Sequence, residues 1–198
     1  LIMKILNKIF LLLILSLFIS SANAKDPMEF ISEITSSASS ILKENISIEQ
    51  KADKLIELAE GSVDISGIGM YSLGKHKKSI NDEQLAKYRN AFREYFLKSF
   101  SSRLSQYSDP KINVLSQNVI NEKYTIVSSV LVATSERPEV KIEWRVYTKD
   151  SKKPFIRDLI IEGLSLARTQ KEEFNSVIQS ANGDVSALIA NLEEFNSK

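Results

Sequence analysis

The spacing of apolar residues along the chain changes near Pro110. On the N-terminal side of this proline, apolar residues recur every three or four positions, which places them on one face of an α-helix. The spacing predicts helices over Pro27 to Lys43, over Ile48 to Glu60, within Val63 to Leu73, and from Asn81 to about Tyr107.

Beyond this proline, apolar and polar residues alternate, as they do along a half-buried β-strand. In the clearest case Ile142, Trp144 and Val146 fall on one face, whereas Lys141 and Arg145 fall on the other. Short polar turns separate the alternating segments and indicate an antiparallel meander with one buried and one solvated face. The predicted strands are Lys111 to Ile120, Tyr124 to Thr134, Val140 to Thr148 and Phe155 to Leu164.

Two further helical segments close the chain, Leu166 to Ser180 and Asp184 to Phe195. Helices that precede and follow a run of strands are typical of the α+β class. We therefore expect a four-stranded curved antiparallel sheet packed against several helices.

The first residues have the pattern of a secretory signal. Lys4 and Lys8 precede an apolar run from Ile9 to Ile19, and Ser20 to Ala24 ends in an Ala-x-Ala cleavage site. The run is shorter than the about 20 residues that a membrane-spanning helix needs. We expect residues 1–24 to be cleaved after Ala24, leaving a single exported domain over residues 25–198.

Composition argues against several classes of function. The chain has 26 basic and 25 acidic residues, so no overall positive field favours nucleic acid as a partner. It has no cysteine and one histidine, His76, which lies among lysines and reads as a solvated loop residue. The paired acids Glu172-Glu173 and Glu193-Glu194 also read as solvated. We therefore predict no catalytic residues and no metal site.

The aromatic residues of one predicted helix have two interpretations. The helix from Asn81 to Tyr107 carries aromatic residues at helical spacing, and such a stripe is usually ordinary core. It could also form one wall of a cavity if it faced the apolar side of a curved sheet. Periodicity alone does not decide between core and cavity wall for these residues, which are Tyr88, Phe92, Tyr95, Phe96, Phe100 and Tyr107.

The segment from Phe155 to Phe174 is a β-branched strand that stops at Gly163 and continues into a charged helix. It resembles the end of the sheet in the Mla-type (toluene-tolerance) periplasmic phospholipid-binding proteins. The resemblance extends from about Asp26 to Leu192, with Pro154-Phe155 where a tryptophan is usual and Gln170 where a tyrosine is common. The positions that carry it include Asp26-Pro27, Val63-Asp64, Leu73-Gly74-Lys75, Asp158, Glu162, Gly163, Ser165, Leu166, Lys171 and Phe174.

This resemblance implies a soluble, monomeric periplasmic carrier whose sheet and helices enclose an apolar pocket. Its cargo would be phospholipid, with no other cofactor, and it would have no enzymatic activity. Its partners would be the substrate-binding ring of an inner-membrane ABC transporter and an outer-membrane lipoprotein complex. The implied pocket-lining residues are Met70, Leu73, Phe92, Phe96, Phe100, Val130, Val132, Ile142, Trp144, Val146, Leu159 and Ile161, and Lys75, Lys77 and Lys78 are candidates for contact with the headgroup or a partner.

Two other classes of protein fit the same pattern of elements. A small-ligand binder or enzyme with a nuclear-transport-factor-2-like cone would place polar, titratable side chains inside the cone. An exported chaperone or scaffold would have a dry, close-packed core. The amount of lipid that the purified protein carries separates both from a phospholipid carrier.

Overall fold

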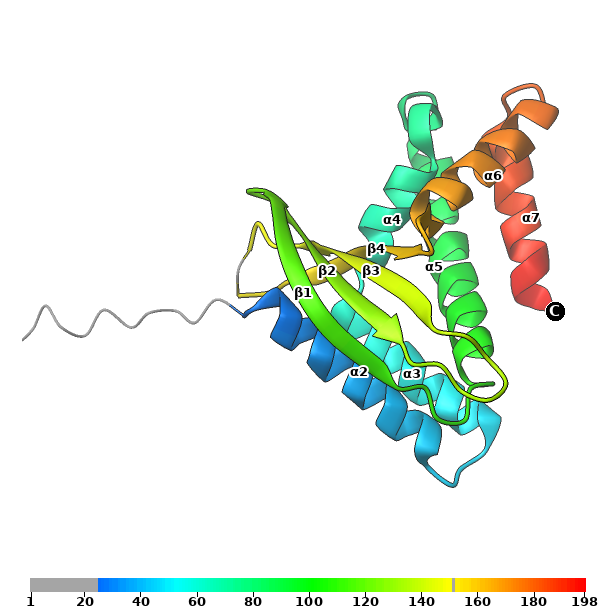
Figure 1. The fold of residues 1–198 in the computed structure, drawn as a ribbon. Coiled ribbons are helices and arrows are strands. Elements are labelled where there is room, and N and C mark those ends of the chain that lie inside the picture. The colour runs from blue at the N-terminus through cyan, green and yellow to red at the C-terminus, as the bar shows by residue number, and fades with distance from the viewer. Residues whose placement is uncertain (1–24, 151) are drawn as a thin grey trace, which may run out of the picture.

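The computed structural model describes residues 25–150 and 152–198, and the predicted signal segment lies outside these residues. The fold is α+β: helices come first, a sheet follows, and helices close the chain (Figure 1). This is the predicted order of elements.

The N-terminal helices lie close to their predicted bounds. They are α2 (Pro27–Lys43), α3 (Ile48–Ser62), α4 (Ile65–Ser72), the 3-10 helix η1 (Gly74–Lys78) and α5 (Asp82–Leu104). Asn81 and Gln84 form the capping box that opens α5, as their spacing predicts. The helix ends at Leu104 rather than at Tyr107, a few residues earlier than its aromatic spacing suggests.

The sheet is an antiparallel meander in the order β1-β2-β3-β4-β5. It has five strands rather than the expected four, because the predicted fourth strand is interrupted at Glu162 and Gly163. Both residues have positive φ, 49° and 82°, so the chain reverses there and pairs back on itself. The strands are β1 (Ile112–Asn121), β2 (Tyr124–Leu131), β3 (Val140–Tyr147), β4 (Phe155–Ile161) and the two-residue β5 (Leu164–Ser165).

One face of the sheet is buried, as the alternation predicts. Val127 of β2 lies opposite Trp144 of β3, which lies opposite Leu159 of β4. Helix α2 packs against the β1 and β2 side of this face and contributes Phe30 and Ile31. We call the resulting cluster the sheet core; it consists of Phe30, Ile31, Val127, Leu131, Ile142, Trp144, Val146 and Ile156.

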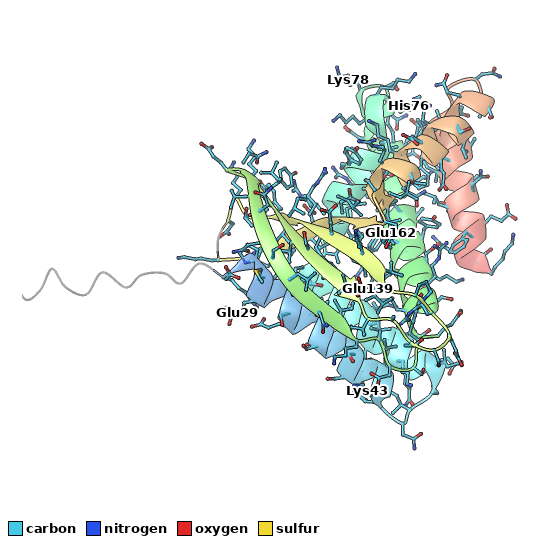
Figure 2. The ribbon with its side chains drawn as sticks, in the orientation of Figure 1. Glu29, Lys43, His76, Lys78, Glu139 and Glu162 are labelled. Carbon is cyan, nitrogen blue, oxygen red and sulfur yellow. The ribbon has the colours of Figure 1, made fainter. Side chains whose placement is uncertain are left out.

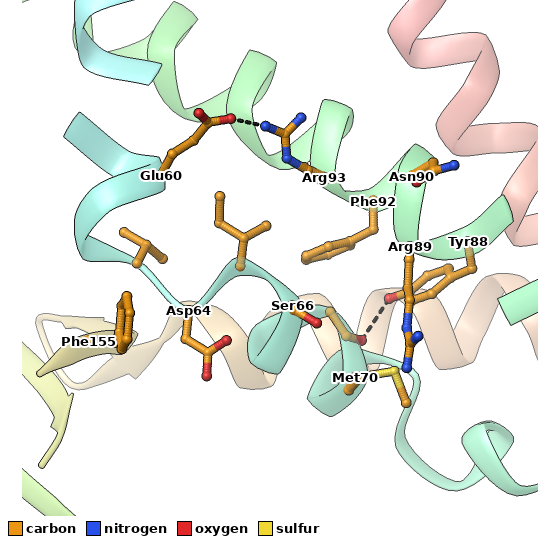
Figure 3. A pocket seen from close by; sticks show the side chains of 13 residues that line it. Glu60, Asp64, Ser66, Met70, Tyr88, Arg89, Asn90, Phe92, Arg93 and Phe155 are labelled. Atoms are coloured by element: carbon orange, nitrogen blue, oxygen red, sulfur yellow. Dashed lines mark hydrogen bonds and ion pairs between the residues drawn. The ribbon is translucent and has the colours of Figure 1, made fainter. Parts of the chain in front are cut away.

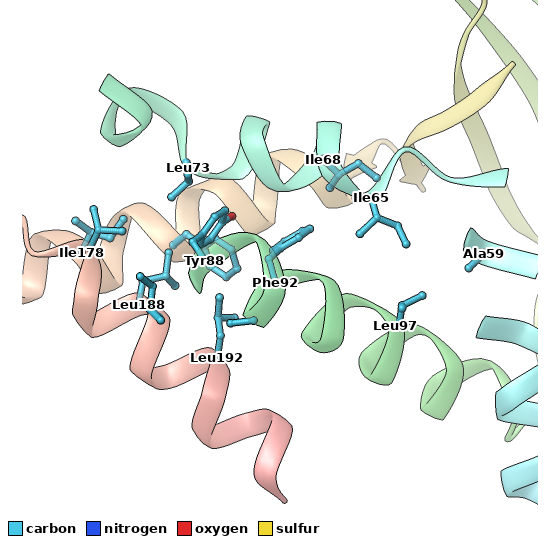
Figure 4. Packing of buried hydrophobic residues seen from close by; sticks show 14 residues of the cluster. Ala59, Ile65, Ile68, Leu73, Tyr88, Phe92, Leu97, Ile178, Leu188 and Leu192 are labelled. Carbon is cyan, nitrogen blue, oxygen red and sulfur yellow. The ribbon is translucent and has the colours of Figure 1, made fainter. Parts of the chain in front are cut away.

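A second apolar cluster lies among the helices (Figure 4). Helix α5 packs on α3, on α4 and on α7 (Val185–Ser197), while α6 (Leu166–Ser180) packs on α4 and α7. We call this cluster the helix core. Its buried residues are Ala59, Ile65, Ile68, Leu73, Tyr88, Ala91, Phe92, Leu97, Phe174, Ile178, Val185, Leu188, Ile189 and Leu192.

Strand β4 connects the two cores. The backbone N–H of Asp64 donates to the carbonyl of Ile156 at 3.0 Å, and the Asp64 carboxylate accepts from Nε of Arg157 at 2.7 Å. The buried Asp158 accepts from the backbone N–H of Ala167 at 2.9 Å and from the Ser165 hydroxyl at 2.6 Å, which ties β4 to the start of α6. Val63, just before Asp64, packs against both clusters.

Candidate functional site

A cleft of about 400 Å³ opens where α3, α4 and α5 meet the first residue of β4 (Figure 3). Its volume lies at the small end of the range for ligand sites, about 300–1,000 Å³. A phospholipid with two acyl chains would therefore extend beyond it. The apolar side chains that line the cleft are Val63, Ile65, Met70, Tyr88, Phe92 and Phe155.

Close packing between α4 and α5 forms the inner end of the cleft. A Cβ atom added to Gly69 would lie 2.7 Å from Cδ1 of Phe92, so glycine permits this approach. The Tyr88 hydroxyl donates a hydrogen bond of 2.8 Å to the Gly69 carbonyl. Burial raises the pKa of Tyr88 far above its ordinary value, so the hydroxyl keeps its proton and remains a donor.

The rim of the cleft is polar. Arg93 forms an ion pair with Glu60 across the opening (Figure 3). Arg89, one turn earlier on α5, has no carboxylate within ion-pair distance among the described residues. An apolar floor below a charged rim matches an amphipathic ligand.

The predicted lining residues on the helices lie around this cleft. Met70 and Phe92 line it directly. Phe96 and Phe100 follow along α5, where they are partly buried and their rings stack with centroids 6.1 Å apart. Leu73, by contrast, is almost completely enclosed by the helix core.

The predicted lining residues on the sheet lie in three settings. Ile142, Trp144 and Val146 belong to the sheet core, and Leu159 packs against its edge. Ile161 lies opposite Ile142 on the same face and is half-buried. Val130 is on the opposite face of β2 from Val127 and Leu131, and Val132 lies just beyond the end of β2, with its N–H bonded to the Lys111 carbonyl.

The lysine cluster lies on η1, away from the cleft. Lys75, Lys77 and Lys78 are exposed, and Lys75 borders a separate depression of about 330 Å³ that Lys171 and Glu172 also line. This depression and the cleft lie at different ends of α4.

His76 is not the solvated residue that its lysine neighbours suggest. It is 7% exposed, and its Nε2 lies 3.1 Å from Oδ1 of Asn175 on α6. The 3-10 turn that follows Gly74 directs His76 toward α6 while Lys77 and Lys78 remain in solvent. His76 and Lys78 appear at the same end of the molecule in Figure 2.

Several residues of the cleft are absent from the predicted lining set. Val63 joins α3 to α4, Ile65 begins α4, and Phe155 begins β4. The bridge between Val63 and Ile156 and the hydrogen bond of Asp64 to β4 bring them together, and local periodicity does not reveal such long-range contacts. The replacement of the usual tryptophan around Pro154-Phe155 was the one signal near this position.

Among residues 25–150 and 152–198, no cluster of three or more histidine, aspartate or glutamate side chains is arranged to hold a metal ion. The buried titratable groups are occupied in structural bonds, Asp158 with α6 and His76 with Asn175. Within the same residues, every helix is too short or too polar to cross a bilayer.

Comparisons with known proteins agree with this geometry. The family model described as "MlaC protein" matches residues 32–194. A solved structure from Ralstonia solanacearum, described as a phospholipid-binding protein in complex with a phospholipid, aligns with a TM-score of 0.74 at 18% identity. The alignment covers 87% of this chain and 98% of that one, and at this identity it establishes the fold. No curated protein matches. The family model spans most of the chain, which therefore belongs to the MlaC protein family.

Proposed function

We propose that the protein is a periplasmic phospholipid carrier that moves lipid between an outer-membrane complex and an inner-membrane ABC transporter. The observation that carries the proposal is the division of the apolar interior into a sheet core and a helix core, with a polar-rimmed cleft at their junction. Membership of the MlaC family and the phospholipid bound to the Ralstonia protein support it.

The acyl chains, in this proposal, lie between the two cores. Phe96 and Phe100 on α5 and Leu159 and Ile161 on β4 are apolar yet only partly buried. They offer apolar surface that the protein's own packing leaves incompletely covered. The headgroup then lies at the rim of the cleft, where Arg89 can meet a phosphate.

Energetics explain why a carrier is needed. An acyl chain of roughly 16 carbons exposed to water costs on the order of 13 kcal/mol, at about 0.8 kcal/mol per methylene. Free diffusion of lipid between membranes is therefore negligible. An apolar, non-directional lining lowers this cost without holding the lipid so tightly that a bilayer cannot take it back.

We propose that residues 1–24 act as the export signal, that residues 25–198 work as one monomeric domain in the periplasm, and that no reaction is catalysed. Lys75, Lys77 and Lys78 would meet an acidic partner surface during handover, because exposed charges chiefly tune encounter rates.

Native mass spectrometry of the exported protein, purified without detergent, tests binding. We expect a mass increase equal to phospholipid, which denaturation removes. Protein that is free of lipid and takes none from vesicles would contradict the proposal and favour a dry-core scaffold. A small polar ligand in its place would favour the cone-shaped binder.

Two tryptophan substitutions locate the lipid. Phe100→Trp adds volume at a half-buried position beside the helix core, where the proposal places an acyl chain, so we expect lower lipid content with the stability of the lipid-free protein largely kept. Val146 is 0% exposed within the sheet core, so Val146→Trp should destabilise by about 1–3 kcal/mol through overpacking. Equal behaviour of the two variants would place Phe100 in ordinary core.

A further inference from the structure

The β1–β2 hairpin ends in two exposed apolar side chains. Val119 is 69% exposed and Ile120 is 53% exposed, beside the turn that contains Glu122 and Lys123. β1 is an edge strand, and the hairpin tip projects beyond the rest of the sheet (Figure 1). Large apolar residues gathered at a projecting tip point to a binding surface.

The turn between β3 and β4 lies beside this tip. The backbone N–H of Thr148 donates to the carbonyl of Lys123 at 2.9 Å, which fixes the two turns side by side. The second turn adds Lys149, Lys152 and Lys153. Lys123 belongs to the first turn. We call Val119, Ile120, Lys123, Lys149, Lys152 and Lys153 the basic hairpin end.

The lysines of the basic hairpin end are exposed, and none has an ion-pair partner among the described residues. The two turns contain the acids Glu122 and Asp150, so the lysines remain in excess. Two exposed apolar side chains and four exposed lysines thus lie at the same end of the sheet.

We propose that the basic hairpin end docks on the surface of a membrane that contains anionic phospholipid. The apolar tip would enter between the headgroups, and the lysine stems would lie along the acyl boundary with their ammonium groups at the phosphates. The anionic lipid complements the unpaired charge of the lysines.

A membrane fits this surface better than a folded protein partner does. A stable protein interface buries about 800 Å² on each partner, usually on a broad patch, whereas the tip is a narrow ribbon of two strands. The location also suits lipid transfer. The ammonium group of Lys153 lies 5.3 Å from the centroid of the Phe155 ring, and Phe155 lines the cleft, so docking brings the cleft beside the bilayer.

Vesicle flotation tests the proposal, using protein purified after export, with its N-terminus read by mass spectrometry. Vesicles of phosphatidylcholine with phosphatidylglycerol are compared with vesicles of phosphatidylcholine alone. We expect binding to the anionic vesicles that added salt weakens. Exchange of Lys123, Lys149 and Lys152 for Gln should weaken binding by about 100-fold, at about fivefold for each lysine.

A second variant, Val119→Ser with Ile120→Ser, tests the contribution of the apolar residues. It should weaken vesicle binding by at least about tenfold. The matched control is Leu164→Ser with Leu166→Ser, which removes side chains that are 58% and 41% exposed at the other end of the sheet. A charge control exchanges Arg103, Lys111 and Lys141, which are exposed and lie outside the basic hairpin end, for Gln. Both controls should bind as the wild type does.

Three results would overturn the proposal: no binding of the wild type to anionic vesicles, unchanged binding of the tip variants, or an equal loss in the controls. Lipid content of each variant is measured in parallel. A tip variant that loses vesicle binding but keeps its bound lipid supports docking separately from the carrier function. Wild-type protein that floats but carries no lipid would support docking while contradicting the carrier function.

Discussion

Trp144 shows how a single buried polar group is satisfied in the sheet core. Its indole N–H donates to the Ser129 hydroxyl at 2.8 Å, and that hydroxyl donates to the Ile142 carbonyl at 3.1 Å. Ser129→Ala leaves the indole N–H without a partner, so we expect a loss of about 1–3 kcal/mol in the free energy of unfolding. Urea unfolding measures it.

The matched control for this prediction is Ser128→Ala. Ser128 lies on the other face of β2 and is only half-buried, so its replacement should change stability by no more than about 0.5 kcal/mol. Equal losses in the two variants would mean that the Ser129 bond contributes nothing specific.

Individual residues also show which burial states the sequence predicts and which it does not. Alternation correctly assigned Ile142, Trp144 and Val146 to the buried face, because strand geometry fixes that face locally. His76 was assigned to solvent and is buried, because its environment depends on α6, about a hundred residues later in the chain. Charged neighbours in sequence therefore say little about a residue in a tight turn.

At the scale of elements, the contact between α4 and α5 depends on one glycine. Gly69→Ala places a Cβ atom 2.7 Å from the Phe92 ring, and we expect a loss of about 1–3 kcal/mol in stability. Gly61 near the end of α3 has no atom within 4 Å of an added Cβ, so Gly61→Ala should be neutral or stabilise by up to about 1 kcal/mol. Thermal melts measure both variants. A lower melting temperature for Gly61→Ala than for Gly69→Ala would contradict this packing.

The start of α2 predicts a dependence on pH. The hydrogen bond from Gln117, and then the backbone N–H of Glu29, lower the pKa of Asp26 below its ordinary value. A carboxylate with a lowered pKa in the folded state stabilises above its unfolded pKa of about 3.9, and this contribution disappears as pH falls through the folded pKa.

Asp26→Ala should therefore destabilise at neutral pH by about 1 kcal/mol, as the loss of an N-cap does. The difference from the wild type should shrink as the pH falls below about 4. Asp26→Asn, which keeps a good capping group, serves as the control. A difference between wild type and Asp26→Ala that is constant from pH 7 to the acid range would contradict the assignment.

Elements were more predictable than their ends. Helices and strands were recognised because their periods of 3.6 and 2 are local properties of the sequence. The division of the last predicted strand into β4 and β5 was missed, because Glu162 adopts positive φ, which a glutamate rarely does. Gly163 marked the turn, but not the short strand that follows it.

At the scale of the whole molecule, the central feature is an apolar interior in two parts. The sequence predicts many of the inward apolar residues, although Val130 lies on the opposite face of β2 from Val127 and Leu131. It does not separate residues that pack against one another from those that border the junction. Phe92 and Phe100 share one helical stripe, yet the first is buried in the helix core and the second is half-buried beside it. The packing of α3, α4 and α7 around α5, which periodicity does not reveal, distinguishes them.

The measurement that tests the carrier account most directly uses Trp144, the single tryptophan of the chain, on the buried face of the sheet. Lipid-free protein is loaded to equal occupancy with phospholipid carrying bromine atoms on its acyl chains or with the same lipid without bromine. Bromine quenches tryptophan fluorescence at close range. If acyl chains lie between the sheet core and the helix core, the brominated lipid will strongly reduce Trp144 emission. Equal emission from the two complexes would contradict the account and place the lipid away from the sheet.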